Sequence, residues 1–437
     1  MNSSRNDIVM SHLSQQELDE IMRKHEVYLK GQNGGARAII KFKNLSGLSM
    51  SGRDLSHADF TGSCFIGANL SGGTFTSATF FACDMRRANL ENACFVRADF
   101  RGAFVAGANL SGADLKSADL REGRIMEKGA GVKGHLSDRH TARGEEQTAR
   151  TVFTGARMMK TNLSAVRAAN ADFADADMSS VTIQGADLKN ANLEGANLSH
   201  SDLTGTDLRG ANLRNSIMEK TVMAMVEKAG ADFENAITEK ATGADISELG
   251  KPLDQLLKEH AVWVATGGGE GKQLDLSGFD LRDVDDLKKF SLTAMHAVGA
   301  NFLNQDFSTT EMQSAVLDES DFRDCLFVKA DVRGSSFKGA RLSRCDFSGA
   351  NLSPLLFSVG GVKRVQPVNM IGASLRYSVM KNARMAGIRL TNADLSYADF
   401  SGCDLRKADL TGAKIDGTIF GDANLEDAVL DPGVEVL

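Results

Sequence analysis

Residues 84–120 read DMRRANLENACFVRADFRGAFVAGANLSGADLKSADL, with a large apolar residue at every fifth position. From Leu45 to Ile125 every position ending in 0 or 5 is Leu, Met, Phe, Val or Ile, which makes 17 consecutive matches. The residue two before each is usually Ala, Gly, Ser or Cys, and the one between is often Asp or Asn. A period of five fits neither the helical 3.6 nor the strand 2.0. The repeat therefore predicts a solenoid.

In such a solenoid each five-residue unit forms one side of a coil. The large and the small residues both point toward the axis, and the Asp or Asn lies at the surface or a corner with the two variable residues. Successive coils stack ~4.8 Å apart, with backbone hydrogen bonds running along the long axis. No coil can bury its own core, so we expect stability to come from stacking.

The motif A(D/N)(L/F)xx resembles the pentapeptide-repeat family, and the resemblance covers well over half of the chain. It implies an all-β solenoid: a right-handed quadrilateral β-helix with four pentapeptides per coil, here with short α-helical caps. It is specific for the fold and says little about function, because the motif residues are the core residues.

The repeat is interrupted, and the interruptions divide the chain. One position inside the second repeat block, Ala168, is weak. We expect a helical cap and glycine turn at 1–44, repeat block 1 at 45–125, a polar insert loop at 126–152, block 2 at 153–218, a partly helical linker at 219–250, a second helical cap and glycine turn at 251–275, block 3 at 276–357, a short interruption at 358–369, and block 4 with a C-terminal tail at 370–437.

The two segments ahead of blocks 1 and 3 align, which indicates an internal duplication at about residue 245. Both have apolar residues at i, i+3, i+4, i+7 and i+10, the spacing of one face of an amphipathic helix. Ser14 and Glu17 predict a capping box, and Pro252 fits the first turn of the second helix. We expect these helices to cover coil ends that would otherwise expose unpaired backbone groups. The interruption at 126–152 falls at the same relative place in the first copy as the interruption at 358–369 does in the second.

Composition narrows the cellular setting. The chain has 437 residues with 43 Gly, only 4 Pro and a net charge of −7. Its apolar stretches are far shorter than the ~20 residues that cross a bilayer, and residues 1–16 have no apolar signal core. We expect a cytoplasmic protein with no membrane span. Four cysteines, Cys83, Cys325, Cys345 and Cys403, occupy the small-residue position, which predicts reduced packing thiols.

The candidate motifs for catalysis or ligand binding do not match the sequence. Glycines before Lys272 in ATGGGEGKQ suggest a phosphate loop, but GxxxxGK[ST] would need Gly at Thr266 and a hydroxyl residue at Gln273. His25 and His260 each stand alone on an apolar helix face, which favours a packed, hydrogen-bonded histidine over a metal ligand. In the insert, His135 and His140 have no identifiable further ligands. We therefore expect no catalytic, cofactor-binding or metal-binding residues, and no enzyme activity.

The function that remains is a non-catalytic protein-interaction rod or scaffold, with specificity in the variable outward positions and in the insert 126–152. Its partner is an unknown protein, with no nucleic acid expected, and the sequence leaves open a homo-oligomer through a helix end. The alternative is a DNA-mimicking inhibitor or protector of DNA gyrase of the fluoroquinolone-resistance type. That role needs a dense anionic surface, whereas residues 45–125 carry eight acidic and eight basic side chains.

Overall fold

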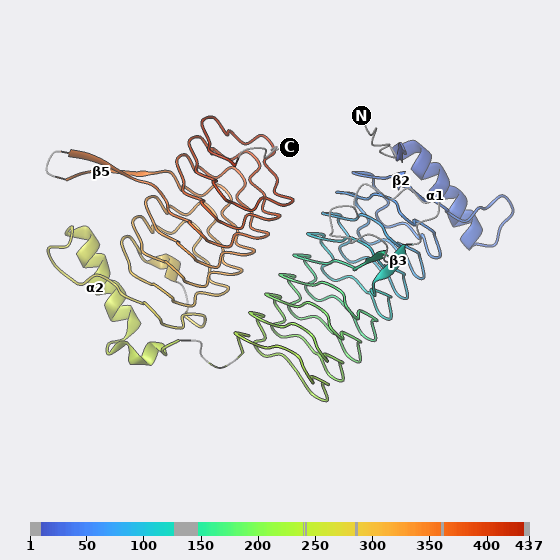
Figure 1. Ribbon diagram of the computed structural model, residues 1–437, viewed down its shortest axis with the longest axis horizontal. Coiled ribbons are helices and arrows are strands. Elements are labelled where there is room, and N and C mark those ends of the chain that lie inside the picture. Colours follow the sequence, from blue (N-terminus) through green and yellow to red (C-terminus); the bar gives the residue numbers. More distant parts are fainter. Residues whose placement is uncertain are drawn as a thin grey trace. The chain divides into compact units, whose positions relative to one another are not determined.

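The computed structural model describes residues 10–125, 147–238, 240, 243–284, 287–359 and 362–431. The chain divides into two compact units, Met1–Glu239 and Lys240–Leu437, which are described separately below. Each unit is a stack of coils with one long helix near its start (Figure 1).

Coils in both units repeat every twenty residues, which is four pentapeptides. Parallel bridges join Asp59 to Thr79 and Thr79 to Asp99 in unit 1, and Asp394 to Lys414 in unit 2. Only one residue per side takes part in each bridge, so the coils contain almost no extended strands. The predicted stacking along the long axis is confirmed, for example by the Leu55 amide, which donates to the carbonyl of Thr74 at 2.7 Å.

The pentapeptide that begins at Asp54 explains why the motif has this composition. Ala58 N–H donates to the Leu55 carbonyl at 3.0 Å, and His57 has a φ of 65°. Those are the features of a type II turn. The Asp54 carboxylate accepts a hydrogen bond from the Ser56 amide at 3.0 Å, as Asp and Asn do in Asx turns. The recurring Asp or Asn is therefore a corner group, and Leu55 and Ala58 are fully buried.

Aromatic rings stack inside the coils at the same twenty-residue interval. Ring centroids are 5.1 Å apart for Phe60–Phe80 and for Phe80–Phe100, and 4.4 Å apart for Phe327–Phe347. Offset stacking of this kind adds to the stabilisation from burial. The core of each unit is thus a continuous column of side chains.

Helix α1 (Gln15–Leu29) precedes the coils of unit 1, and α2 (Leu253–Ala265) precedes those of unit 2. The predicted capping box is present, since the Ser14 amide donates to the Glu17 carboxylate at 2.8 Å and the Glu17 amide donates to the Ser14 hydroxyl. Leu18 and Met22 are buried in the core of unit 1, and Leu257 in that of unit 2. β1 (Ser11–His12) pairs in parallel with β2 (Lys43–Asn44). Short 3-10 helices span Ile246–Leu249 and Leu287–Lys289.

The prediction of a partly helical linker at 219–250 is wrong for most of this range. Bridges continue from Asp202 to Val222 and from Ile217 to Ile237, so another coil occupies this region. Among the described residues of 219–250, only the 3-10 helix Ile246–Leu249 is helical. The pattern was weak because Lys228 stands where an apolar residue is expected. The last coil packs against another coil on one of its two faces only, so its inward positions tolerate polar residues more readily.

Both interruptions leave the coils as antiparallel hairpins. The first has β3 (Gly123–Ile125) and β4 (Gln147–Ala149), and the second has β5 (Leu355–Val359) and β6 (Val362–Gln366). Ile125 and Phe357 continue the five-residue spacing by coincidence, because each lies in a hairpin strand, so blocks 1 and 3 end earlier than predicted.

The two hairpins do not leave from equivalent corners. The first hairpin leaves the coils after Leu120. Leu120 belongs to the side of the coils whose first buried residue is Ile40, and Ile40 comes two residues after Ala38, whose amide donates to His25. The matching side of unit 2 begins with Leu276. There, the hairpin leaves after Leu352, one side earlier. Their equivalence in sequence position was therefore only approximate.

Candidate functional site

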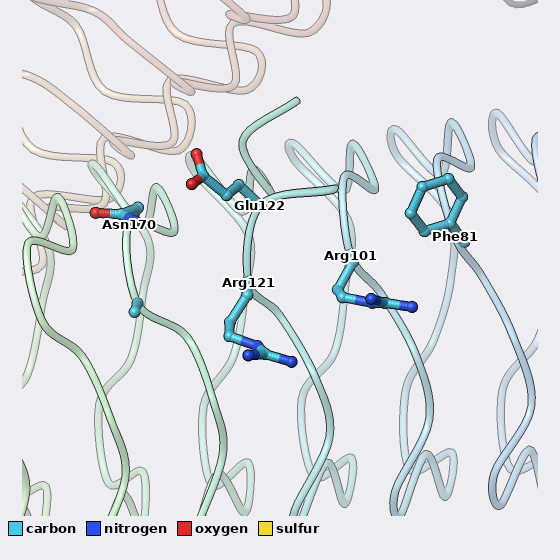
Figure 2. Close-up of a pocket in the computed structure, with 6 residues that line it drawn as sticks. Phe81, Arg101, Arg121, Glu122 and Asn170 are labelled. Carbon is cyan, nitrogen blue, oxygen red and sulfur yellow. The ribbon is translucent and has the colours of Figure 1, made fainter. Parts of the chain in front are cut away.

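A pocket of about 470 Å³ opens on unit 1 beside the root of the β3–β4 hairpin. Figure 2 shows Arg101 and Arg121 pointing the same way from neighbouring coils, with Phe81 one coil further along. Glu122, which follows Arg121 in the chain, and Asn170, on the next coil, also line the pocket. Ala169 completes the lining.

On one side of the coils, the buried apolar residues of successive coils include Phe80, Phe100 and Leu120. The residue that follows each of them points outward, and these outward residues form a column that contains the pocket. At four of the six levels from Phe80 to Leu208, an Asp precedes the buried residue and an Arg or Lys follows it. The Arg101 Nε and Nη2 donate to Asp99 at 2.9 and 2.8 Å, and Arg121 binds Asp119 in the same way at 2.9 Å. Successive residues of the column are Phe81, Arg101, Arg121, Ala169, Lys189 and Arg209.

The level after Arg121 breaks this pattern. It has Arg167 before the buried residue and Ala169 after it. The Arg167 guanidinium therefore reaches back to Asp119, at 2.9 Å, and the short Ala169 side chain leaves space next to Arg121. This substitution in the column creates the pocket.

Three guanidinium groups lie around Asp119. Its carboxylate contacts Arg121, Arg167 and, at 3.8 Å, Arg101. Burial opposes its ionisation, but hydrogen bonds and charge from Arg121, together with the charge of Arg167, hold the Asp119 pKa below its ordinary value. Three guanidiniums thus contact two carboxylates, Asp99 and Asp119, and Glu122 also lines the pocket. The arrangement can bind an anionic group, and it offers no nucleophile with an adjacent base.

The hairpin root and the pocket are fixed to each other. The buried Thr151 hydroxyl donates to the carbonyl of Arg121 at 2.7 Å and accepts from the amide of Gly102 at 2.9 Å. Gly123 packs so closely that an added Cβ would lie 2.9 Å from the Phe81 ring. The predicted insert, with His135 and His140, continues from here, and residues 126–146 lie outside the described residues.

The histidines singled out from the sequence hold the helices on the coils. His25 Nδ1 accepts from the Ala38 amide at 3.0 Å, and its Nε2 lies 3.0 Å from the carbonyl oxygen of Ser56. His260 Nδ1 accepts from the Leu274 amide at 3.0 Å. Burial lowers the pKa of both rings. In the described part of the chain, no group of three His, Cys, Asp or Glu side chains is placed to hold a metal ion.

The glycine-rich segment before Lys272 turns the chain at the end of α2. The Lys272 amide donates to the Glu259 carbonyl at 3.2 Å, and a Cβ on Gly271 would lie 2.2 Å from that same oxygen. The loop therefore packs on the helix. All six cysteines are free thiols. Burial raises the pKa of Cys403 to about 12, and its thiol donates to the Met380 carbonyl at 2.8 Å.

Sequence reasoning missed the pocket because its residues occupy the variable outward positions. A period of five shows that Arg101 and Arg121 face outward, but only the twenty-residue coil places them next to Ala169. Two signals were available in the sequence. One is the recurring Asp-x-Arg at 99–101, 119–121 and 207–209. The other is the weak repeat position Ala168, whose neighbours Arg167 and Ala169 depart from that pattern.

Within the described ranges, no helix is long and apolar enough to cross a membrane.

Comparison with known proteins bears on the repeat. A family model described as pentapeptide repeats matches in eight copies, at residues 44–76, 93–125, 156–195, 191–223, 315–353 and 369–406. No curated protein gives a significant match to the chain.

Several solved structures are similar. One is QnrB1, a plasmid-mediated fluoroquinolone resistance protein, with 17% identity over 50% of this chain and 89% of that one, and a TM-score of 0.29. Another is HetL, a pentapeptide repeat protein involved in heterocyst differentiation regulation from Nostoc sp. strain PCC 7120, with 18% identity, coverage of 94% and 96%, and a TM-score of 0.15. A third, alr5209 from Nostoc PCC 7120, is 30% identical over 23% of this chain and 83% of that one, with a TM-score of 0.13.

The family model and the coils agree closely along the chain. The matched segments fall on residues whose bridges recur every twenty positions, with the apolar centre and the small residue buried in each. The protein belongs to the pentapeptide-repeat family.

Proposed function

We propose that this protein is a non-catalytic interaction scaffold, and that it binds an acidic group of a partner protein at the Arg101–Arg121 pocket. The proposal includes the right-handed quadrilateral winding typical of the family, a capping role for α1 and α2, and a cytoplasmic location. The buried positions of Leu18, Met22 and Leu257 support the capping role.

The observation that carries the proposal is the break in the ion-pair column at Ala169. Elsewhere in the column, Arg209 is matched by Asp207 and Lys189 bridges Asp187 and Asp207. At the break, the guanidiniums of Arg101, Arg121 and Arg167 gather around Asp119 beside an open pocket. An aspartate, a glutamate or a C-terminal carboxylate of a partner would accept hydrogen bonds from these guanidiniums.

The alternative role as a DNA mimic finds less support in these contacts. Four acidic residues of the column, Asp99, Asp119, Asp187 and Asp207, each lie within 4 Å of an Arg or Lys nitrogen. A basic DNA-binding groove would meet paired carboxylates, which attract it weakly.

The test compares two arginines that have the same local pairing. Arg121 lines the pocket, whereas Arg209 pairs with Asp207 outside it, and their side chains are 44% and 52% exposed. A partner would be identified by affinity capture from the source cell and then titrated, as a purified protein, by isothermal calorimetry. We expect Arg121→Ala to weaken binding at least tenfold and Arg209→Ala to change it less than twofold.

Two results would contradict the proposal. One is the absence of any reproducible partner. The other is an equal loss of affinity in the Arg121 and Arg209 variants, because that would indicate general electrostatic attraction. Higher salt should weaken a pocket-bound carboxylate only moderately, since partly buried charge pairs are screened less than exposed ones.

A further inference from the structure

The β5–β6 hairpin of unit 2 projects away from its coils as a separate arm (Figure 1). Five residue pairs hold it together, from Leu355↔Gln366 to Val359↔Val362. Its sheet contains only these two strands, and no other strand of the described residues pairs with either edge. The backbone on both outer edges is therefore available to a further strand.

The hairpin exposes several apolar side chains to water, which is unfavourable for an isolated two-stranded sheet. Leu356 is 73% exposed and its cross-strand neighbour Val365 is 62% exposed. Val362 is also 62% exposed, and Phe357 is 36% exposed. An isolated two-stranded hairpin is marginally stable, whereas three or more strands with an apolar face are stable on their own. The composition of the arm therefore fits a larger sheet.

The two edges differ in charge. β5 reads LLFSV and has no charged residue, whereas β6 reads VKRVQ and has Lys363 and Arg364 in its centre. Charged side chains, Lys above all, are the usual protection of an edge strand against pairing with other chains. β6 has this protection and β5 lacks it.

We propose that β5 pairs with β5 of a second copy of the chain, antiparallel and about a two-fold axis through Phe357. Phe357 then lies opposite Phe357 of the partner subunit, and Leu356 lies opposite Ser358 of the partner subunit. The product is a four-stranded antiparallel sheet in the order β6–β5–β5–β6, with an isologous interface.

Charge favours a second copy and selects this edge. The uncharged β5 strand offers no charge to attract a charged partner strand, and pairing of β5 with another β5 brings no charged side chains together. In the proposed sheet, the two β6 strands are three strand spacings apart, about 14 Å, which exceeds the screening length of about 10 Å at 0.1 M salt. Pairing through β6 would instead place Lys363 and Arg364 directly against the same cations of the other copy.

The experiment is sedimentation of the full chain at physiological salt, from low-micromolar to several hundred micromolar protein. We expect a concentration-dependent monomer–dimer equilibrium. Leu356→Lys should lower the association constant at least tenfold, because the new charge lies beside the incoming strand. Val365→Lys places the same charge on the same face of the same hairpin, but on β6, and should change the constant less than threefold.

A cysteine pair tests the register. Phe357→Cys should cross-link two copies under mild oxidation, because directly opposite residues have Cα atoms about 4.5–5.5 Å apart, within disulfide reach. Ser358→Cys should not, since its counterpart would lie about 8 Å away, beyond the reach of a disulfide. The proposal is overturned by a protein that stays monomeric at all concentrations, by equal effects of the two lysine variants, or by a dimer that survives replacement of 355–366 with a short Gly-Ser turn.

Discussion

Adjacent residues of one pentapeptide can have opposite environments. Phe327 is fully buried and stacks on Phe307 and Phe347 at centroid distances of 5.1 and 4.4 Å, whereas Leu326 is 43% exposed. The type II turn recurs every five residues, so the same position of each pentapeptide points toward the axis of the coils. The energetic importance of a residue therefore depends on its phase more than on its hydrophobicity.

Replacing the stacked ring tests this rule. We expect Phe327→Ala to lower the free energy of unfolding by about 3–5 kcal/mol, since it leaves a cavity between two other rings. The matched change Leu326→Ala should cost less than about 1 kcal/mol, as exposed substitutions usually do. Trp263, the single tryptophan of the chain, lies in unit 2 and reports urea unfolding by fluorescence. Equal losses in the two variants would contradict the predicted phase.

Protonation of the buried histidines should weaken the helix contacts. Both rings accept a hydrogen bond from a backbone amide at Nδ1, which only the neutral ring can do. Their pKa values are lowered by burial, so the unfolded chain binds protons more readily than the folded one. Stability is then full above the unfolded pKa of about 6.5 and declines as pH falls from there toward the lower folded pKa.

The measurement is urea unfolding at several pH values between about 7.5 and 5.5. Wild-type protein should lose stability across this range, and the double variant His25→Gln/His260→Gln should be less stable at neutral pH but change less with pH. His260 stacks on Trp263 at 5.8 Å, so fluorescence gives a local signal. Around His25 the charged groups are Asp54, Arg37 and His57. An unchanged slope in the double variant would assign the pH effect to other groups.

Hairpins β3–β4 and β5–β6 are the elements that depart from the repeat, and their roots are built differently from the coils. At the first root, Thr151 replaces a lost coil contact with two side-chain hydrogen bonds, to Arg121 and Gly102. This fixes the backbone from which Arg121 extends into the pocket. The geometry of the pocket therefore depends on the hairpin root.

Removing the Thr151 hydroxyl at constant shape should loosen this root. Thr151→Val leaves the Gly102 amide and the Arg121 carbonyl without this partner, at a cost of about 1–3 kcal/mol. Hydrogen exchange of the Gly102 amide should become at least tenfold faster. Thr79→Val, at a partly exposed position on the neighbouring side of the coils, serves as the control. If Gly102 exchanges at the same rate in both variants, the hydroxyl does not hold the root.

At the level of the whole molecule, acidic and basic side chains are nearly balanced. The net charge is −7 over 437 residues. In the described column of unit 1, Asp99, Asp119, Asp187 and Asp207 each contact an Arg or a Lys. This part of the surface is therefore not uniformly anionic, as a DNA mimic would require.

We therefore expect no effect on DNA gyrase. The full-length protein at micromolar concentration should leave the rate of gyrase supercoiling unchanged, with a known protein inhibitor as the positive control. Inhibition at these concentrations, abolished by reversing charges in the column, would support the DNA-mimic role instead.

The sequence by itself determined the stacked coils and the buried positions, because the five-residue spacing recurs along the chain. It also determined both helices and the Ser14–Glu17 capping box, because these depend on neighbours within a few residues. It failed at 219–237, where an open coil end tolerates Lys228, and at Ile125 and Phe357, where spacing alone cannot distinguish a hairpin strand from a coil. The tertiary structure decided the pocket and the exposed β5 edge. Arg121 and Ala169 are 48 residues apart in sequence, and only the stacking of one coil on the next, across the insert, brings them together.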